Sequence, residues 1–207
     1  MAKLVIFDMD GTITDSRSNI AASINYARTA KGLPPLDERD VAERINALTF
    51  DATKDLYGEN ASESDHEAFE RHYATSCLRD LRLYDGILET LQTLRSRGVA
   101  MAIATNATSG FAQKMMTHLG VADYFAEMVG ADLARAKPAP DMLNLVLSRM
   151  NMSAADSYFA GDSGKDMKAA LEAKITSVFV TWGYGVENQL ANYTINKPRE
   201  LLAIVGL

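Results

Sequence analysis

Two aspartates, two residues apart, follow the first apolar run of the chain. Asp8 and Asp10 come directly after residues 3–7, a run of the kind that forms a buried strand of a parallel sheet. In an extended segment, side chains two residues apart point to the same side, so these carboxylates would lie close together and repel each other. Such groups either take up protons or are neutralised by a divalent cation. The pair therefore points to a metal site or to a carboxyl group that holds a proton.

Further polar residues stand where later strands are expected to end. They are Thr105 and Asn106, Lys137, and Asp162 and Asp166. Because ligands bind at the carboxyl ends of the strands in a parallel α/β sheet, we expect all these groups to gather at one edge. Hard oxygen ligands around a phosphate favour Mg²⁺, with water and substrate oxygens completing the octahedron.

Each of these features also has a plainer explanation. Aspartates after a strand often form turns or cap helices, and Asp162 could be an N-cap and nothing else. Thr105 and Asn106 could satisfy backbone groups where a strand ends, and Lys137 could be a solvated loop lysine. Their joint occurrence at successive strand ends favours a catalytic site over these explanations.

The chain from about residue 84 onward predicts alternating helices and strands. Apolar runs at 99–104, 158–160 and 177–180 are typical of buried strands, and apolar stripes over 87–94, 111–119 and 142–150 have helical spacing. This pattern predicts an α/β fold: a Rossmann-like parallel sheet with helices on both faces.

Residues 16–81 break this alternation, because they show helical patterns and no convincing strand. Asp37 is a plausible N-cap, and Ser64 with Glu67 forms a capping-box pattern. We therefore predict a catalytic core made of residues 1–15 and 82–207, with an inserted helical cap domain at 16–81. An ordinary helical stretch within a single domain is the alternative.

The composition limits the class of protein. The chain has 207 residues, of which 47% are hydrophobic and 23% charged, so it is long enough for a sizeable core. A net charge of −6 gives no sign of a nucleic-acid partner. No apolar stretch is long enough for a membrane span, and a single cysteine, Cys77, fits a reducing compartment. We expect a cytoplasmic protein, monomeric or homodimeric.

Taken together, the motifs resemble the haloacid dehalogenase-like hydrolase superfamily, in particular its phosphoglycolate phosphatase and β-phosphoglucomutase-like branch. The first motif matches residues 7–12 (Phe-Asp-Met-Asp-Gly-Thr), the second Thr105-Asn106, the third Lys137-Pro138 and the fourth 161–166. Phrases at 119–125 and 138–141 match as well, so the resemblance covers essentially the whole chain. The helical block at 16–81 sits where this branch carries its helical cap.

The resemblance implies a mechanism and a role for each motif residue. Asp8 would attack phosphorus and form an aspartyl-phosphate, and Asp10 would protonate the leaving alkoxide and then activate water. Thr105, Asn106 and Lys137 would bind the phosphoryl oxygens. Mg²⁺ would be held by Asp8, Asp162 and the main-chain carbonyl of Asp10, with Asp166 holding a metal-bound water. The implied substrate is a small phosphorylated metabolite such as phosphoglycolate or a sugar phosphate.

Other activities of the family fit less well. Dehalogenases need no acid at the position of Asp10, and phosphonate-cleaving relatives carry a small residue there. A phosphomutase stays open as an alternative, although the arginine-bearing cap loop of those relatives is not recognisable around 49–54. A non-catalytic binding protein is a further alternative. The cap is expected to select the substrate, with Arg17, Arg44 and Lys54 as candidates for contacting an acidic or sugar substrate.

Overall fold

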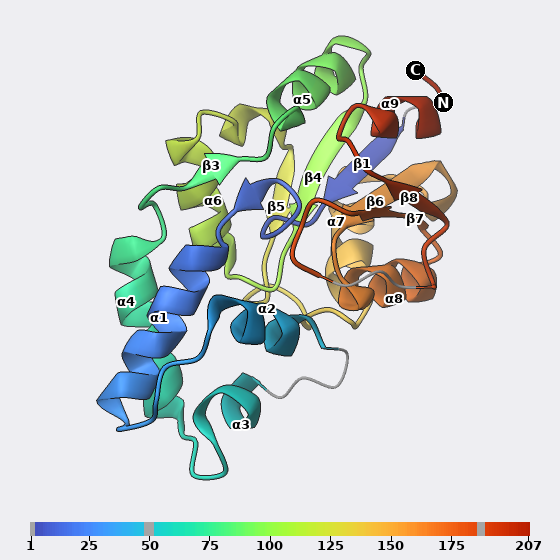
Figure 1. Cartoon of the computed structure of the whole chain (residues 1–207). Helices are drawn as coiled ribbons and strands as arrows, with labels where there is room; N and C mark the ends of the chain where they lie inside the picture. Colours follow the sequence, from blue (N-terminus) through green and yellow to red (C-terminus); the bar gives the residue numbers. More distant parts are fainter. Residues whose placement is uncertain (1–2, 48–51, 186–188) are drawn as a thin grey trace.

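A computed structural model describes residues 3–47, 52–185 and 189–207. Its centre is a six-stranded sheet in the order β5-β4-β1-β6-β7-β8, and all neighbouring strands are parallel. The strands are β1 (Leu4–Phe7), β4 (Ala100–Ala104), β5 (Glu127–Val129), β6 (Ser157–Gly161), β7 (Thr176–Val180) and β8 (Tyr193–Ile195). Figure 1 shows the sheet between two layers of helices.

The central strand β1 is buried on both faces, which explains its unbroken apolar sequence. Val5 and Phe7 point into one apolar cluster, which α5 (Ile87–Ser96), α6 (Ser109–His118) and α9 (Glu200–Ile204) cover. Leu4 and Ile6 point into a second cluster, on the face covered by α7 (Asp141–Met150) and α8 (Gly164–Ala173). The predicted α/β fold with helices on both faces of a parallel sheet is confirmed.

Between the first strand and the rest of the sheet, the described part of the chain forms four helices. They are α1 (Arg17–Ala30), α2 (Glu38–Asn46), α3 (Ala52–Tyr57) and α4 (Glu63–Ser76). Figure 1 shows them gathered to one side of the sheet, where they share an apolar cluster of their own that includes Ile24, Val41 and Leu56. The short antiparallel pair of β2 (Thr14–Asp15) and β3 (Arg82–Leu83) brings the two ends of this segment together.

The helix starts agree only in part with the sequence patterns. Asp37 caps α2 as predicted, since its side chain accepts a hydrogen bond from the backbone amide of Arg39. The capping box of α4 is formed by Ser62 and Asp65, so the predicted pair Ser64 and Glu67 was wrong. Both pairs have the same spacing, and the helix begins at the earlier serine.

The sequence patterns also missed four strands. β2 and β3 have two residues each, and β5 and β8 have three. Segments this short contain no measurable alternation of apolar and polar residues.

No helix among the described residues is long and apolar enough to cross a membrane.

Candidate active site

The predicted site residues come together beyond the carboxyl ends of the central strands. Asp8 follows β1 directly, Thr105 follows β4 and Asp162 follows β6. Lys137 lies in the connection between β5 and α7, and Asp166 lies in the first turn of α8. The sheet thus brings together residues that are more than a hundred positions apart in the chain.

Lys137 connects two of the carboxylates. Its Nζ lies 2.7 Å from Asp8 Oδ1 and 2.7 Å from Asp166 Oδ1, and it donates a hydrogen bond of 2.9 Å to the carbonyl of Ala104. Burial alone would lower the pKa of this lysine, but the carboxylates of Asp166 and Asp8 outweigh burial and raise the pKa. Lys137 is therefore a fixed positive charge.

Asn106 fixes the backbone of Lys137. Its Oδ1 accepts a hydrogen bond of 2.8 Å from the amide of Lys137, and its Nδ2 donates one of 3.0 Å to the carbonyl of the same residue. Because these bonds use both ends of the side-chain amide, a phosphate contact from Asn106 would have to come from its backbone amide.

Thr105 is almost completely buried and lines the same cavity as Asp8. Its Oγ1 accepts a hydrogen bond of 3.2 Å from the amide of Ala107. The hydroxyl proton is then available to a phosphoryl oxygen, because a hydroxyl both donates and accepts.

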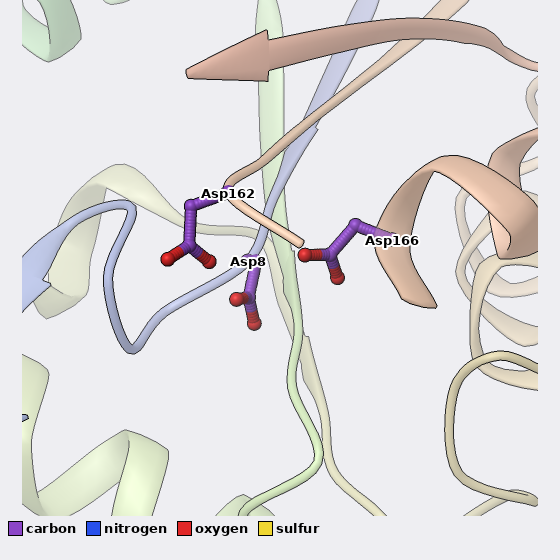
Figure 2. A group of neighbouring side chains, drawn as sticks. All are labelled: Asp8, Asp162 and Asp166. Carbon is purple, nitrogen blue, oxygen red and sulfur yellow. The ribbon is translucent and has the colours of Figure 1, made fainter. Parts of the chain in front are cut away.

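Asp8, Asp162 and Asp166 form a compact acidic group. Each offers a carboxylate oxygen within 4.8 Å of the others, and all three side chains are buried. Figure 2 shows Asp162 and Asp166 on either side of Asp8. Asp162 Oδ2 accepts two backbone hydrogen bonds of 2.9 Å, from Tyr184 and Gly185.

Asp166 is oriented by the start of its own helix. Its Oδ2 accepts hydrogen bonds from the amide and hydroxyl of Ser163, at 3.0 and 2.5 Å, so the two residues form the capping box of α8. The N-cap of this helix is Ser163, which removes the explanation of Asp162 as a mere N-cap.

The charge of this group fits a divalent cation. Burial raises the pKa of Asp8 well above its usual value, against the effect of Lys137. Burial and the charge of Asp166 raise the pKa of Asp162 to about 7. Three buried carboxylates facing one ammonium leave negative charge uncompensated, and a hard cation with oxygen ligands would neutralise it. The donor set is therefore suitable for a metal such as Mg²⁺.

The carboxylate of Asp10 stands outside this acidic group. Its Oδ1 accepts a hydrogen bond of 2.5 Å from the hydroxyl of Ser16, and burial raises its pKa although that bond opposes the shift. A raised pKa favours the protonated form, which a general acid requires. The turn after it needs glycine, because a Cβ on Gly11 would lie 2.3 Å from Asp162 Oδ2.

A cavity of about 600 Å³ opens over Asp8 and Asp10. Its far wall comes from the helices that precede β3 and is mainly apolar, with Ile20, Ile24, Leu56, Phe69 and Tyr73. A second depression, of about 800 Å³, lies beside β3 and α5 and contains none of the predicted site residues. The cavity lined by Asp8, Asp10 and Asp166 is therefore the candidate site for a substrate.

The three cations singled out from the sequence, Arg17, Arg44 and Lys54, are not among the described residues that line this cavity. Arg17 lies over the ring of Tyr184, Arg44 donates to the carbonyl of Asp55, and Lys54 lies 3.9 Å from Glu59. Residues 48–51, which include part of the loop compared with phosphomutases, lie outside the described residues.

Lys165 is the cavity-lining cation that the sequence analysis missed. It belongs to the fourth motif, is nearly buried, and donates a hydrogen bond of 2.7 Å to the carbonyl of Ile45 in α2. Burial lowers its pKa to about 8. The one sequence signal for this location was the position of Lys165 between Ser163 and Asp166, which were both expected at the carboxyl end of a strand.

Comparisons with known proteins agree with this geometry. A model of the haloacid dehalogenase-like hydrolase family matches residues 5–180. The phosphoglycolate phosphatase of Pectobacterium atrosepticum is 31% identical, with 97% of this chain and 91% of that protein covered. The N-acetylmuramic acid 6-phosphate phosphatase of Pseudomonas aeruginosa is 29% identical, with 98% and 94% covered.

The fold has close structural relatives as well. The crystal structure of a predicted phosphoglycolate phosphatase from Haemophilus somnus superposes with a TM-score of 0.85 at 26% identity, covering 98% of this chain and 97% of that one. The predicted family and its phosphatase class are thereby confirmed. The chain belongs to the haloacid dehalogenase-like hydrolases, in the branch that resembles phosphoglycolate phosphatases.

Proposed function

We propose that the protein is a Mg²⁺-dependent phosphatase that hydrolyses a small phosphomonoester through an aspartyl-phosphate on Asp8. The observation that carries this proposal is the pairing of two carboxyl groups in different environments at the base of one cavity. Asp8 lies 2.7 Å from Lys137 beside two further carboxylates, whereas Asp10 is hydrogen-bonded to Ser16. Burial raises the pKa of both groups, but Lys137 and a bound cation would hold Asp8 as the anion that a nucleophile requires, whereas Asp10 is not paired with Lys137 and would hold the proton that an acid requires.

In the first half of the reaction, Asp8 attacks phosphorus and the bond from phosphorus to the leaving oxygen breaks. Asp10 gives its proton to that oxygen, so the leaving group departs as an alcohol. Lys137 holds the attacking carboxylate and offsets the negative charge that gathers around phosphorus. The hydroxyl of Thr105 and the backbone amide of Asn106 would donate hydrogen bonds to the phosphoryl oxygens.

In the second half, Asp10 is an anion and accepts a proton from a water molecule. That water attacks phosphorus, the bond to Asp8 breaks, and inorganic phosphate leaves. Asp8 is then again a carboxylate and Asp10 again an acid, so the cycle closes without any other reactant.

Asp8, Asp162 and the main-chain carbonyl of Asp10 would hold Mg²⁺, with Asp166 contributing through a bound water. When bound, the ion offsets the repulsion between an anionic nucleophile and an anionic phosphate. The carboxylates of Asp8, Asp162 and Asp166 converge, and Asp162 and Asp166 are held by the backbone of residues 184–185 and by Ser163.

We further propose that residues 16–81 act as the cap that selects the substrate. The far wall of the cavity comes from α1–α4 and both ends of the segment meet at the β2–β3 pair. The core residues 1–15 and 82–207 would then supply the chemistry. Cap closure over the cavity would exclude water from the first half of the reaction.

The deciding experiment is phosphate release from a panel of phosphorylated metabolites, with phosphoglycolate, sugar phosphates and N-acetylmuramic acid 6-phosphate included. Turnover should require Mg²⁺, stop in EDTA and fall by about a thousandfold or more in Asp8→Asn. No release from any ester by the folded wild type would refute the phosphatase proposal. Conversion of a sugar phosphate with a bisphosphate intermediate would indicate a phosphomutase instead.

A further inference from the structure

The segment Trp182-Gly183-Tyr184-Gly185, which follows β7, touches both halves of the proposed catalytic machinery. The amides of Tyr184 and Gly185 donate to Asp162 Oδ2, as described above. The indole Nε1 of Trp182 donates a hydrogen bond of 3.0 Å to the carbonyl of Thr12, in the turn after Asp10. The segment is therefore hydrogen-bonded to both the first and the fourth motif.

The glycines allow this close approach. A Cβ on Gly185 would lie 1.9 Å from the carbonyl oxygen of Asp162, and one on Gly183 would lie 2.4 Å from Asp162 Oδ2. Any side chain at these positions would push the segment away from the acidic group. The backbone of Tyr184 thus has a fixed position relative to Asp162.

The side chain of Tyr184 is linked to Asp10, the proposed acid, through the hydroxyl of Ser16. Its Oη lies 3.3 Å from the hydroxyl of Ser16, and Ser16 lies 2.5 Å from Asp10 Oδ1. Serine has a single hydroxyl proton, which Ser16 donates to the carboxylate. Tyr184 must therefore be the donor to Ser16, and the chain runs from Tyr184 through Ser16 to Asp10.

This chain defines which oxygen of Asp10 faces the substrate. Oδ1 is engaged by Ser16, and among the described residues no hydrogen-bond donor contacts Oδ2. Both Asp10 and Tyr184 line the cavity above Asp8. A carboxyl group fixed in this way presents Oδ2, with its proton, to the leaving oxygen.

The ring of Tyr184 also contacts Arg17, the first residue of α1. The guanidinium carbon of Arg17 lies 5.0 Å from the centre of the ring, a distance typical of a cation–π contact. Arg17 directly follows Ser16, so one short stretch of chain contacts both the hydroxyl and the ring of the tyrosine.

We propose that Tyr184 is a positioning residue, which orients the proposed acid Asp10 through the hydroxyl of Ser16. This inference rests on the acid role given to Asp10 above. Removing the tyrosine hydroxyl lets Ser16 rotate away from Asp10 Oδ1 and lets the carboxyl turn from the leaving oxygen. Proton donation is then impaired while attack by Asp8 is not.

The test compares two leaving groups in Tyr184→Phe, which keeps the ring and the backbone amide. An alkyl alcohol must receive a proton as it leaves, whereas p-nitrophenolate is stable without one. The two esters are p-nitrophenyl phosphate and the alkyl phosphate that wild type hydrolyses fastest, with phosphoglycolate and glucose 6-phosphate as the first probes. For the alkyl ester, kcat should fall about tenfold with KM changed less than about twofold, and for the aryl ester kcat should change less than about twofold.

Two further variants separate positioning from a general structural role. Tyr193→Phe removes a hydroxyl from an exposed tyrosine in β8 and should leave both activities unchanged. Ser16→Ala should show the same contrast between the esters, and the double variant of Ser16 and Tyr184 should lose no more than Ser16→Ala alone. The concentration of Mg²⁺ needed for half-activation should stay within about twofold in Tyr184→Phe, since its backbone bond to Asp162 remains.

Equal losses on both esters, additive losses in the double variant, or no loss at all would overturn the inference. These results differ from a failure of the phosphatase proposal. That failure would show as wild type without turnover of either ester, or as Asp8→Asn with full activity, and it would overturn both.

Discussion

Lys137 shows how one side chain organises the candidate site. Its ammonium contacts Asp8 and Asp166, its backbone is held by Asn106, and its side chain is nearly completely buried. A buried charge of this kind is stable only while its partners are present, and each partner depends on it in turn. The same contacts that orient the nucleophile therefore contribute to the stability of the fold.

We predict that Lys137→Met lowers both activity and stability. Loss of the ammonium leaves Asp8 and Asp166 facing each other, so the free energy of unfolding at pH 8 should fall by about 3 kcal/mol. Turnover should fall by about a hundredfold or more, because the charge no longer restrains Asp8. Urea denaturation and phosphate release measure the two effects, and Lys168→Met, an exposed lysine paired with Glu172, is the matched control. Wild-type stability in Lys137→Met would contradict this account.

Asp162 allows a prediction with a defined dependence on pH. Its pKa is raised from 3.8 to about 7, by burial first and by Asp166 second. A carboxyl whose pKa is higher in the fold than in the unfolded chain stabilises the fold while it is protonated, below about pH 4, and that contribution is lost as the pH rises through about 7. Without a divalent cation, Asp162 should therefore destabilise the folded protein most above pH 7.

Asp162→Asn should consequently stabilise the metal-free protein at pH 8, by about 1–3 kcal/mol, and should make little difference at pH 4. The amide oxygen of asparagine can still accept the bonds from Tyr184 and Gly185, so packing is preserved. Urea denaturation in EDTA measures the effect, with the exposed Asp123→Asn as the control. A variant that is less stable than wild type at pH 8 would show that Asp162 is held mainly as an anion.

At the scale of helices and strands, the arrangement of the sheet positions the candidate site residues. β1, β4 and β6 lie side by side and end at the same edge, so Asp8, Thr105 and Asp162 must meet. These three strands were predictable because they are apolar on both faces. The sequence did not predict their order in the sheet, and the parallel α/β pattern implied only that their carboxyl ends share one edge.

Other parts of the fold and of the candidate site have no recognisable pattern in the sequence and were not predicted. β8 is an edge strand of three residues in which Tyr193 is half exposed, and β5 has one fully buried residue, Val129. The bond from Lys165 to Ile45 joins α8 to α2, two elements far apart in sequence, and depends on how the cap helices lie against the core. Neither composition nor spacing specifies that contact, so sequence reasoning placed the substrate-facing charge on Arg17, Arg44 and Lys54 instead.

The aromatic residues of α4 and α6 form a wall between the cap helices and the core. Phe69 stacks on Tyr73 at 5.3 Å, and Tyr73 meets Phe111 edge-on at 5.0 Å between ring centres. All three line the cavity above Asp8. Under the proposed function, we expect this wall to limit the size of the leaving group.

Phe111→Ala should therefore act on substrate binding rather than on chemistry. We expect KM for the preferred ester to rise about fivefold while kcat changes less than about twofold, because contacts to the leaving group are made before and during the reaction alike. Steady-state kinetics on the preferred ester and on p-nitrophenyl phosphate measure this. A fall in kcat with unchanged KM would assign Phe111 to the transition state instead.

For the molecule as a whole, the net charge has the same sign as the proposed substrate. The chain carries a net charge of −6, yet its proposed substrate is an anion. Under the proposed function, attraction would come locally from Lys137, Lys165 and a bound cation rather than from the net charge of the chain. Because the carboxylates must lose their protons to bind a metal, cation binding and stability are linked through pH.

We predict that saturating Mg²⁺ raises the thermal midpoint of wild type by about 5 °C at pH 8 and by much less at pH 5.5. The raised pKa values of Asp8 and Asp162 are the reason, because protons compete with the metal at the lower pH. Differential scanning fluorimetry measures the shift, with sodium chloride at matched ionic strength as the control. Asp162→Asn should lose the gain, and an equal gain at both pH values would place the metal elsewhere.

The position of β1 in the middle of the sheet has a consequence for how the chain folds. Leu4 pairs with Ala100 on one side and with Ser157 on the other, so β1 has no sheet partner until residues 100–104 have been made and no second partner until residues 157–161 have been made. The helices α1–α4, in contrast, contact one another within residues 17–76. We therefore expect the cap helices to associate early and the catalytic centre to assemble last, in the slow step set by these distant pairings.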